Sequence, residues 1–216
     1  MKDIAIFGAG GFGKEVACLI KRINDASDQP LWNIIGFFDD GKKKGDVVSH
    51  FGKVLGGMEE LNNWATPVAI AIAIGNSGAV KTVVERIKNP NVSYPNLIDR
   101  SFYIVDPQTF KIGQGNIIQG QSSVSCDVEI GDFNILNGWV VIGHDVKIKN
   151  YNTFLPATRI SGDVTIGSHN KFGAQSFVMQ GLKIGDEVTL GPCSAMLSKP
   201  KDGRVYIGVP AKRFKF

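Results

Sequence analysis

Hydrophobic side chains recur every six residues through the second half of the chain, from Phe110 to Met196. A period of six does not match the 3.6 residues of an α-helical turn, so a helix would scatter these side chains around its surface. A short strand followed by a bend fits the period, and repeats of this length indicate a parallel β-helix in which successive coils stack. The fifteen positions are Ile112, Ile118, Val124, Ile130, Leu136, Ile142, Ile148, Phe154, Ile160, Ile166, Phe172, Val178, Ile184, Leu190 and Met196.

Residues eighteen positions apart match better than residues six apart, which indicates that three repeats make one coil. One column of the predicted core is isoleucine throughout, at positions 112, 130, 148, 166 and 184. Asparagine recurs with the same period at Asn116, Asn134, Asn152 and Asn170, and stacked asparagines can satisfy their amides along the stack. The sequence therefore predicts a parallel β-helix of five coils with no inserted loop. The alternative is a chance run of isoleucine and glycine in an ordinary β-sandwich.

Strands and helices alternate through the first half of the chain, which predicts a small parallel sheet with ligands at the carboxyl ends of its strands. The expected strands lie before Gly8 and at 32–38 and 67–74, and the expected helices end near Arg22 or cover 58–64 and 80–88. Residues 89–101 contain two prolines and are expected to link two domains. We expect a half-Rossmann-like α/β domain at 1–98 and a β-helix domain with a C-terminal tail at 99–216.

Composition narrows the classes of function without selecting one. The 216 residues carry a formal net charge of +4, and cations cluster only at Lys42 to Lys44 and at the extreme C-terminus. A ligand phosphate would explain this bias, so nucleic acid is not required. Cys18, Cys126 and Cys193 lie far apart without histidines at metal spacing, so we expect no metal and reduced cysteines, at core or turn positions, in a cytoplasmic protein. No segment resembles a secretory signal or a membrane span.

A glycine-rich loop follows the first predicted strand. Gly8, Gly10 and Gly13 have the spacing of the dinucleotide fingerprint, in which bare backbone amides at a helix N-terminus hold phosphate. Asp39 and Asp40 end the second strand, where a β-α-β unit would bring them beside this loop. A nicotinamide-dependent oxidoreductase is the obvious hypothesis, but about a hundred residues are too few for two such halves and a substrate domain. A mononucleotide fits better, and a purely structural turn is the remaining alternative.

His144 is the histidine most suited to chemistry. It follows a core position at a predicted coil corner, where a side chain projects outward, and Asp145 is adjacent. A histidine beside a carboxylate could act as a general base. The eighteen-residue period places Gly162 one coil after His144, and Asn137 lies seven residues before it on the neighbouring coil face. His50 and His169 are expected to be solvated turn residues.

The chain resembles the bacterial sugar O- and N-acyltransferases of the sialic acid acetyltransferase type. The resemblance rests on the glycine loop, Phe38-Asp39-Asp40 and Ala73-Ile74-Gly75-Asn76, followed by repeats that contain Ile142-Gly143-His144-Asp145 and end in Gly208-Val209-Pro210-Ala211-Lys212. Acetyltransferases that act on nucleotide-linked amino sugars match best by pattern. The resemblance covers nearly the whole chain, and it implies a left-handed coil and a homotrimer with active sites between subunits.

The resemblance also assigns roles to single residues. His144 would be the general base and Asp145 would orient it or stabilise its charge, while Asn137 and the backbone amide of Gly162 would lie near the reacting groups of acetyl-CoA. The expected nucleotide-sugar site consists of Gly8, Gly10, Gly11, Phe12, Gly13, Asp39, Asp40 and Asn76. Thr153 and Phe12 stand where relatives often carry histidine or, for Phe12, another polar residue. Thr153 could bond the pantetheine arm, and Phe12 could pack on a sugar or base ring.

The function expected from these observations is acetyl transfer from acetyl-CoA to an amine or hydroxyl of a nucleotide-linked sugar. A UDP-4-amino-4,6-dideoxy sugar in bacterial surface glycan synthesis is the first choice of acceptor. Two alternatives stay open. One is O-acetylation of sialic acid or a related free sugar, and the other is a trimeric scaffold that binds a nucleotide sugar without catalysis.

Overall fold

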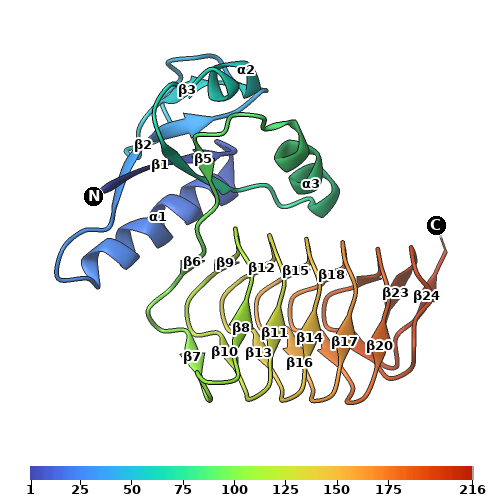
Figure 1. The fold of residues 1–216 in the computed structure, drawn as a ribbon. Coiled ribbons are helices and arrows are strands. Elements are labelled where there is room, and N and C mark those ends of the chain that lie inside the picture. Colours follow the sequence, from blue (N-terminus) through green and yellow to red (C-terminus); the bar gives the residue numbers. More distant parts are fainter. Residues whose placement is uncertain (216) are drawn as a thin grey trace. The chain divides into compact units, whose positions relative to one another are not determined.

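The chain forms two compact units, Met1–Arg100 and Ser101–Phe216. The structure is a computed structural model that describes residues 1–215, apart from the side chain of Ser77. Figure 1 shows an α/β unit followed by a β-helix whose coils lie side by side along one axis. None of the helices within residues 1–215 is long and apolar enough to cross a membrane.

The N-terminal unit is built on a five-stranded parallel sheet in the order β3-β2-β1-β4-β5. Its elements are β1 (Lys2–Phe7), α1 (Gly11–Asp25), β2 (Trp32–Phe38), β3 (Val54–Gly56), α2 (Met58–Asn62), β4 (Val68–Ile72), α3 (Ser77–Arg86) and β5 (Val92–Ser93). Strand β4 and the last four residues of β1 are apolar and buried, as expected for strands that are covered on both faces. Because β1 and β4 are neighbours and their connections leave in opposite directions along the sheet, their carboxyl ends form a switch point of the kind that binds ligands.

The predicted elements of this unit are all present, with ends shifted by up to three residues. The two strands that the sequence did not indicate, β3 and β5, have only three and two residues. Segments this short carry no readable alternation of side chains. The expected linker at 89–101 is consequently not irregular throughout, because it contains β5 and the first strand of the next sheet, β6 (Leu97–Ile98).

The second unit is a left-handed parallel β-helix with three sheets, which confirms the predicted fold class. The β7 sheet contains β7 (Tyr103–Ile104), β10 (Ser123–Val124), β13 (Val141–Ile142), β16 (Arg159–Ile160), β19 (Phe177–Val178) and β22 (Ala195–Met196). The β8 sheet contains β8 (Lys111–Ile112), β11 (Glu129–Ile130), β14 (Lys147–Ile148), β17 (Thr165–Ile166) and β20 (Lys183–Ile184). The β9 sheet contains β6, β9 (Ile117–Ile118), β12 (Ile135–Leu136), β15 (Thr153–Phe154), β18 (Lys171–Phe172), β21 (Thr189–Leu190), β23 (Val205–Ile207) and β24 (Lys212–Phe214). Strands β7 to β21 make five three-strand coils.

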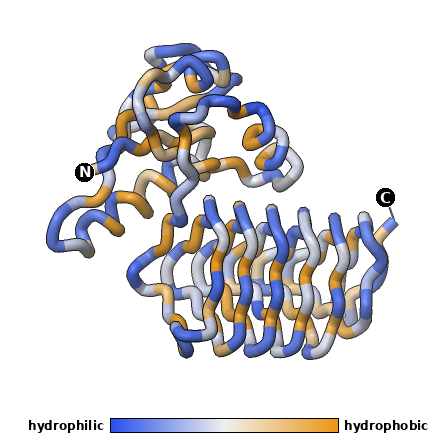
Figure 2. Tube along the Cα trace, viewed as in Figure 1, coloured by the Kyte–Doolittle hydropathy of each residue, from blue (hydrophilic) through white to orange (hydrophobic). Residues whose placement is uncertain are grey.

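The second residue of each two-residue strand from β9 to β22 points into the β-helix and is almost completely buried. Register pairs join residues eighteen apart, such as Ile130 with Ile148, so the predicted columns are real stacks. Hydrophobic and hydrophilic segments alternate along each coil as a result (Figure 2). Within the core, the rings of Phe154 and Phe172 lie parallel, with centroids 4.8 Å apart.

The asparagine column forms a continuous hydrogen-bonded ladder inside the β-helix. Oδ1 of Asn134 accepts bonds from the backbone N–H and Nδ2 of Asn152, at 2.9 and 3.0 Å. Oδ1 of Asn152 accepts the same pair from Asn170. All four asparagines of the column are fully buried. Burial of polar amides is tolerated here because each one is bonded to its neighbours along the axis.

The β-helix begins before the predicted repeat. Strand β7 pairs Ile104 with Val124, which are twenty positions apart rather than eighteen. Two extra residues between β7 and β8 break the six-residue period at this point, and the sequence pattern therefore missed β7.

One expectation about a minor residue was wrong, because Cys18 is exposed on α1, at neither a core nor a turn position. His169 lies at a turn and is partly exposed, and its ring also stacks on Tyr151 with centroids 5.0 Å apart and an interplanar angle of 8°. Tyr151 stacks in turn on Phe133, so these three rings form a column at one corner of the β-helix.

Candidate functional site

The glycine loop of the N-terminal unit combines two glycines that packing requires with two that it does not. Gly8 has φ +113°, and a Cβ there would lie 2.6 Å from the carbonyl oxygen of Ala73. A Cβ on Gly13 would lie 2.0 Å from the Gly8 oxygen. Gly10 and Gly11 have open space where a side chain would stand. The backbone is therefore closely packed at Gly8 and Gly13 and uncovered at Gly10 and Gly11. This leaves the amides at the N-terminus of α1 accessible to an anion.

One of the two predicted acidic residues, Asp39, contacts this loop, and both are bonded within the protein. Oδ2 of Asp39 accepts the N–H of Ala9 at 2.7 Å, and Oδ1 accepts the N–H of Gly41 at 2.8 Å. Oδ1 of Asp40 accepts the Met58 N–H at the start of α2, while Oδ2 pairs with Arg86 at 3.0 Å. Asp39 therefore shapes the glycine loop, and Asp40 joins α2 to the end of α3.

Asn76 also has a structural bond. Its Oδ1 caps α3 by accepting the Ala79 N–H at 3.1 Å. Asn76 follows β4 and the glycine loop follows β1, so both lie at the carboxyl edge of neighbouring strands. Phe12, in the first turn of α1, is partly exposed. The structure thus brings the predicted nucleotide-sugar residues to one edge of the sheet.

A polar cavity of about 360 Å³ lies at the carboxyl end of β2 and adds residues that the sequence did not single out. Asp39 and Asp40 line it together with Lys42, Lys44 and Arg86. The sequence contained a signal for the lysines, since they belong to one of its few cationic clusters. It contained none for Arg86, which comes from the far end of α3. Glu60 also lines the cavity, and its pKa is lowered mainly because its carboxylate accepts the Gly57 N–H.

The second candidate site is a corner of the β-helix between β13 and β14. Nδ1 of His144 lies 2.7 Å from Oδ2 of Asp145, and both side chains are about half exposed. Asp145 has φ +58°, so the chain turns sharply between the two residues. The carboxylate holds one ring nitrogen, which leaves Nε2 of the imidazole to exchange a proton with a ligand.

Gly162 lies directly against this imidazole, one coil further along. A Cβ at position 162 would be 2.5 Å from Nε2 of His144. The backbone ladder aligns the two coils, because the Asp163 N–H donates to the His144 carbonyl at 2.8 Å. Gly162 is therefore needed for the histidine ring to lie where it does. Its amide is not a donor in any bond to a described residue.

Asn137 and Thr153 do not join His144 within one chain. Asn137 follows β12 and His144 follows β13, so they occupy different corners at opposite edges of the β7 sheet. Oδ1 of Asn137 is buried and has no hydrogen-bond partner among the described residues. Thr153 lies on β15 of the β9 sheet and is 4% exposed. Within the described residues, no group of three or more histidine, cysteine or acidic side chains could hold a metal ion.

Comparisons with known proteins agree with this two-unit organisation. Residues 3–87 match the family described as the PglD N-terminal domain. The acetyltransferase domain of PglB from Neisseria gonorrhoeae is 26% identical, with a TM-score of 0.87, and the match covers 99% of this chain and 100% of that one. The same domain in complex with acetyl coenzyme A matches with a TM-score of 0.86 at 26% identity and covers 99% of each chain.

PerB from Caulobacter crescentus, in complex with CoA and GDP-perosamine, has a TM-score of 0.84 at 21% identity. That match covers 100% of this chain and 98% of PerB, and at this identity it shows the fold alone. A search of curated protein sequences finds no match. The predicted resemblance to hexapeptide-repeat sugar acetyltransferases is confirmed by the family match and the whole-chain structural matches together.

Proposed function

We propose that this chain, a hexapeptide-repeat acyltransferase, moves the acetyl group of acetyl-CoA to the amine of a nucleotide-linked sugar. The observation that carries the proposal is the exposed His144–Asp145 pair against the bare backbone of Gly162. The PglB domain is in complex with acetyl coenzyme A, which supports the donor, and PerB, which shares the fold, is in complex with GDP-perosamine. A UDP-4-amino-4,6-dideoxy sugar for surface glycan synthesis is the acceptor that we propose to test first.

The reaction needs a base because a protonated amine cannot attack a thioester. Nε2 of His144 takes a proton from the amine as its nitrogen bonds to the acetyl carbon, and Asp145 stabilises the imidazolium. The Gly162 N–H donates to the carbonyl oxygen while that oxygen carries negative charge. When the carbon–sulfur bond breaks, the proton on His144 passes to the sulfur and CoA leaves as a thiol.

The nucleotide part of the acceptor would bind at the N-terminal unit. The open N-terminus of α1 at Gly10 and Gly11 suits the phosphates, and Asp39 holds the loop in shape for them. Lys42 and Lys44 line the neighbouring cavity without an ion pair to any described residue. They provide donors for the carbonyl groups of a base or for a ribose hydroxyl.

We also propose a homotrimer that packs through the outer face of the β7 sheet. Tyr103 and Phe177 are 65% and 39% exposed on this face, and Trp139 at its edge is 58% exposed. Exposed apolar surface of this kind marks an interaction site. Asn137 and His144 lie at opposite edges of this face. In a cyclic trimer, one edge of the face in each subunit lies beside the opposite edge in the next subunit. Asn137 of one subunit would therefore approach His144 of another. Sedimentation of the purified chain tests this, and a monomer with full activity would contradict it.

The cellular location that we propose is the cytoplasm, because the chain has three free cysteines and both proposed substrates are intracellular metabolites.

The function is tested by release of free thiol from acetyl-CoA across a panel of UDP-, GDP- and CMP-linked amino sugars and free sialic acid. We expect turnover with a nucleotide-linked amino sugar, and we expect His144→Ala to reduce kcat by about a thousandfold. Lys2→Ala, an exposed substitution at the amino end of β1, opposite to the edge of the sheet that carries the glycine loop, is the control. Turnover only with sialic acid would show that the acceptor is a free sugar and not a nucleotide-linked one. Binding of nucleotide sugars without turnover on any member of the panel would favour the non-catalytic scaffold.

A further inference from the structure

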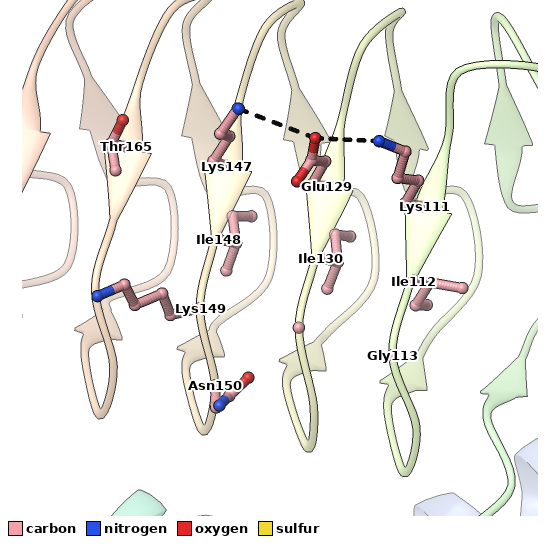
Figure 3. Close-up of a pocket in the computed structure, with 11 residues that line it drawn as sticks. Lys111, Ile112, Gly113, Glu129, Ile130, Lys147, Ile148, Lys149, Asn150 and Thr165 are labelled. Atoms are coloured by element: carbon pink, nitrogen blue, oxygen red, sulfur yellow. Dashed lines mark hydrogen bonds and ion pairs between the residues drawn. The ribbon is translucent and has the colours of Figure 1, made fainter.

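The outer face of the β8 sheet contains a cavity, and none of the residues to which the proposed function gives a role lines it. Its volume is about 460 Å³, and it extends over β8, β11, β14 and β17. Figure 3 shows its lining side chains, which include Lys111, Glu129, Lys147, Lys149 and Thr165. The cavity is open to solvent and most of its charged groups are cationic.

Three of these side chains form a row across successive coils. Oε1 of Glu129 lies 3.4 Å from Nζ of Lys111 and 3.8 Å from Nζ of Lys147 (Figure 3). One carboxylate thus faces two ammonium groups, and Lys149 adds a third that forms no ion pair with a described residue. The cavity keeps a surplus of two positive charges, which is suited to an anionic ligand.

Stability does not account for this row. The side chains of Lys111 and Lys147 are 74% and 64% exposed, and ion pairs at such positions contribute little to folding. The other two faces of the β-helix are different. At the equivalent outward position the β7 sheet carries a single cation, Arg159, and the two-residue strands of the β9 sheet carry only Lys171. Cations are therefore concentrated on one face.

That face adjoins the corner of the general base. Lys147 is three residues after His144, and three residues of extended chain span at most about 10 Å. A ligand phosphate held by Lys147 and Lys149 would therefore lie on the same coil as the imidazole, a few residues beyond it.

We propose that the cavity on the β8 sheet is a diphosphate subsite of the acetyl-transfer site, in which Lys147, Lys149 and Lys111 bind the ligand. This inference rests on the proposed function, since it assumes that His144 is the reacting base. Glu129 is a positioning residue, because its carboxylate holds two of the lysines over the cavity. A diphosphate occurs both in CoA and in a nucleotide-linked sugar, and kinetic measurements can tell these sources apart.

The test compares the double variant Lys147→Ala/Lys149→Ala with Lys171→Ala, which removes an exposed lysine from the equivalent position on another face. We expect the double variant to raise the KM of one substrate about tenfold, with kcat within about twofold of the wild type and a weaker dependence of KM on salt. A rise for acetyl-CoA alone assigns its diphosphate to the cavity, and a rise for the acceptor alone assigns that of the nucleotide sugar. Unchanged KM values, or an equal change in Lys171→Ala, would overturn the proposal.

A second measurement separates this inference from the proposed function. Calorimetry with CoA and with inorganic pyrophosphate needs no turnover. If the wild type transfers no acetyl group, the proposed function fails, whereas loss of CoA or pyrophosphate binding in the double variant alone would still establish the subsite. Absence of binding of both to the wild type would refute it. Circular dichroism checks that the double variant retains the β-helix.

Discussion

The two units of this protein position their functional side chains by different means. In the β-helix, the neighbour of a corner residue is the residue one coil away, as His144 and Gly162 illustrate. In the α/β unit, Asp39 bonds to Ala9 across thirty positions and Asp40 to Arg86 across forty-six. No period connects these pairs. Translation along an axis makes contacts predictable from sequence, whereas a non-repeating sheet requires the whole topology to be known.

The difference also affects how each unit responds to substitution. Contacts in the β-helix are shared between adjacent coils, so one substitution disturbs partners on both sides. In the glycine loop, the backbone of another residue comes close to single glycines only. Neighbouring glycines can therefore differ completely in whether they tolerate a side chain. Two substitutions with matched controls test this contrast, and a third tests a single local hydrogen bond within the α/β unit.

The largest effect is expected for Asn152→Ala in the asparagine ladder. The change removes the acceptor of two Asn170 donors and the donor to the Gly167 carbonyl, all inside the β-helix. We expect the free energy of unfolding to fall by about 4 kcal/mol, because groups that lose their partners stay buried. Urea unfolding followed by circular dichroism measures the change.

Asn150→Ala is the matched control for the ladder. Asn150 accepts one bond from the Asp132 N–H at a surface turn, so its loss should cost about 1 kcal/mol. Equal losses for the two variants would show that the ladder is not shared between coils, and the contrast between the units would then fail.

A smaller effect is expected for Gly13→Ala in the glycine loop. A Cβ at this position would overlap the Gly8 carbonyl oxygen, so α1 must move away from β1. We expect a loss of about 3 kcal/mol, confined to the N-terminal unit. Gly11→Ala should instead be neutral or slightly stabilising, because its position is open and alanine favours a helix.

Tryptophan fluorescence is a suitable measurement for this pair, since Trp32 and Trp64 lie in the N-terminal unit and Trp139 lies in the β-helix. Equal destabilisation by Gly13→Ala and Gly11→Ala would mean that the loop has no position where packing excludes a side chain.

The smallest effect concerns acid stability at Glu60. Its pKa is lowered in the folded state, chiefly by the bond from the Gly57 N–H. The carboxylate therefore contributes stability above the unfolded pKa, and that contribution is lost as pH falls through the folded value. Thermal midpoints between about pH 6 and pH 3 should fall less steeply in Glu60→Gln than in the wild type. Glu59→Gln is the control, and a slope that matched Glu60→Gln would argue against a specific role for Glu60.

Much of the fold could be predicted because its signals are local or periodic. The six-residue pattern located the strands from β8 to β22, and the eighteen-residue period predicted the asparagine ladder and the place of Gly162. Strand β7 was missed because Ile104 and Val124 are twenty residues apart. Strands β3 and β5 were missed because they are held by neighbours in the sheet rather than by a pattern of their own.

The candidate site was less predictable than the fold. The sequence indicated Asp39 and Asp40 as ligand contacts, yet their oxygens bond to Ala9, Gly41, Met58 and Arg86. It placed Asn137 near His144, whereas the chain fold puts the two at opposite edges of the β7 sheet. Lys42, Lys44 and Arg86 became candidate binding residues only from the structure, in which all three line the cavity at the end of β2.

The sequence by itself determined the repeat, the columns of the core and the corner that presents His144, because a coil of fixed length converts distance along the chain into a position in space. Tertiary structure alone decided which oxygens of the acidic pair are already bonded, that the side-chain oxygen of Asn137 has no hydrogen-bond partner among the described residues, and that Lys42, Lys44 and Arg86 line one cavity. These depend on side-chain direction and on contacts between segments without a common period, and residue order does not specify either.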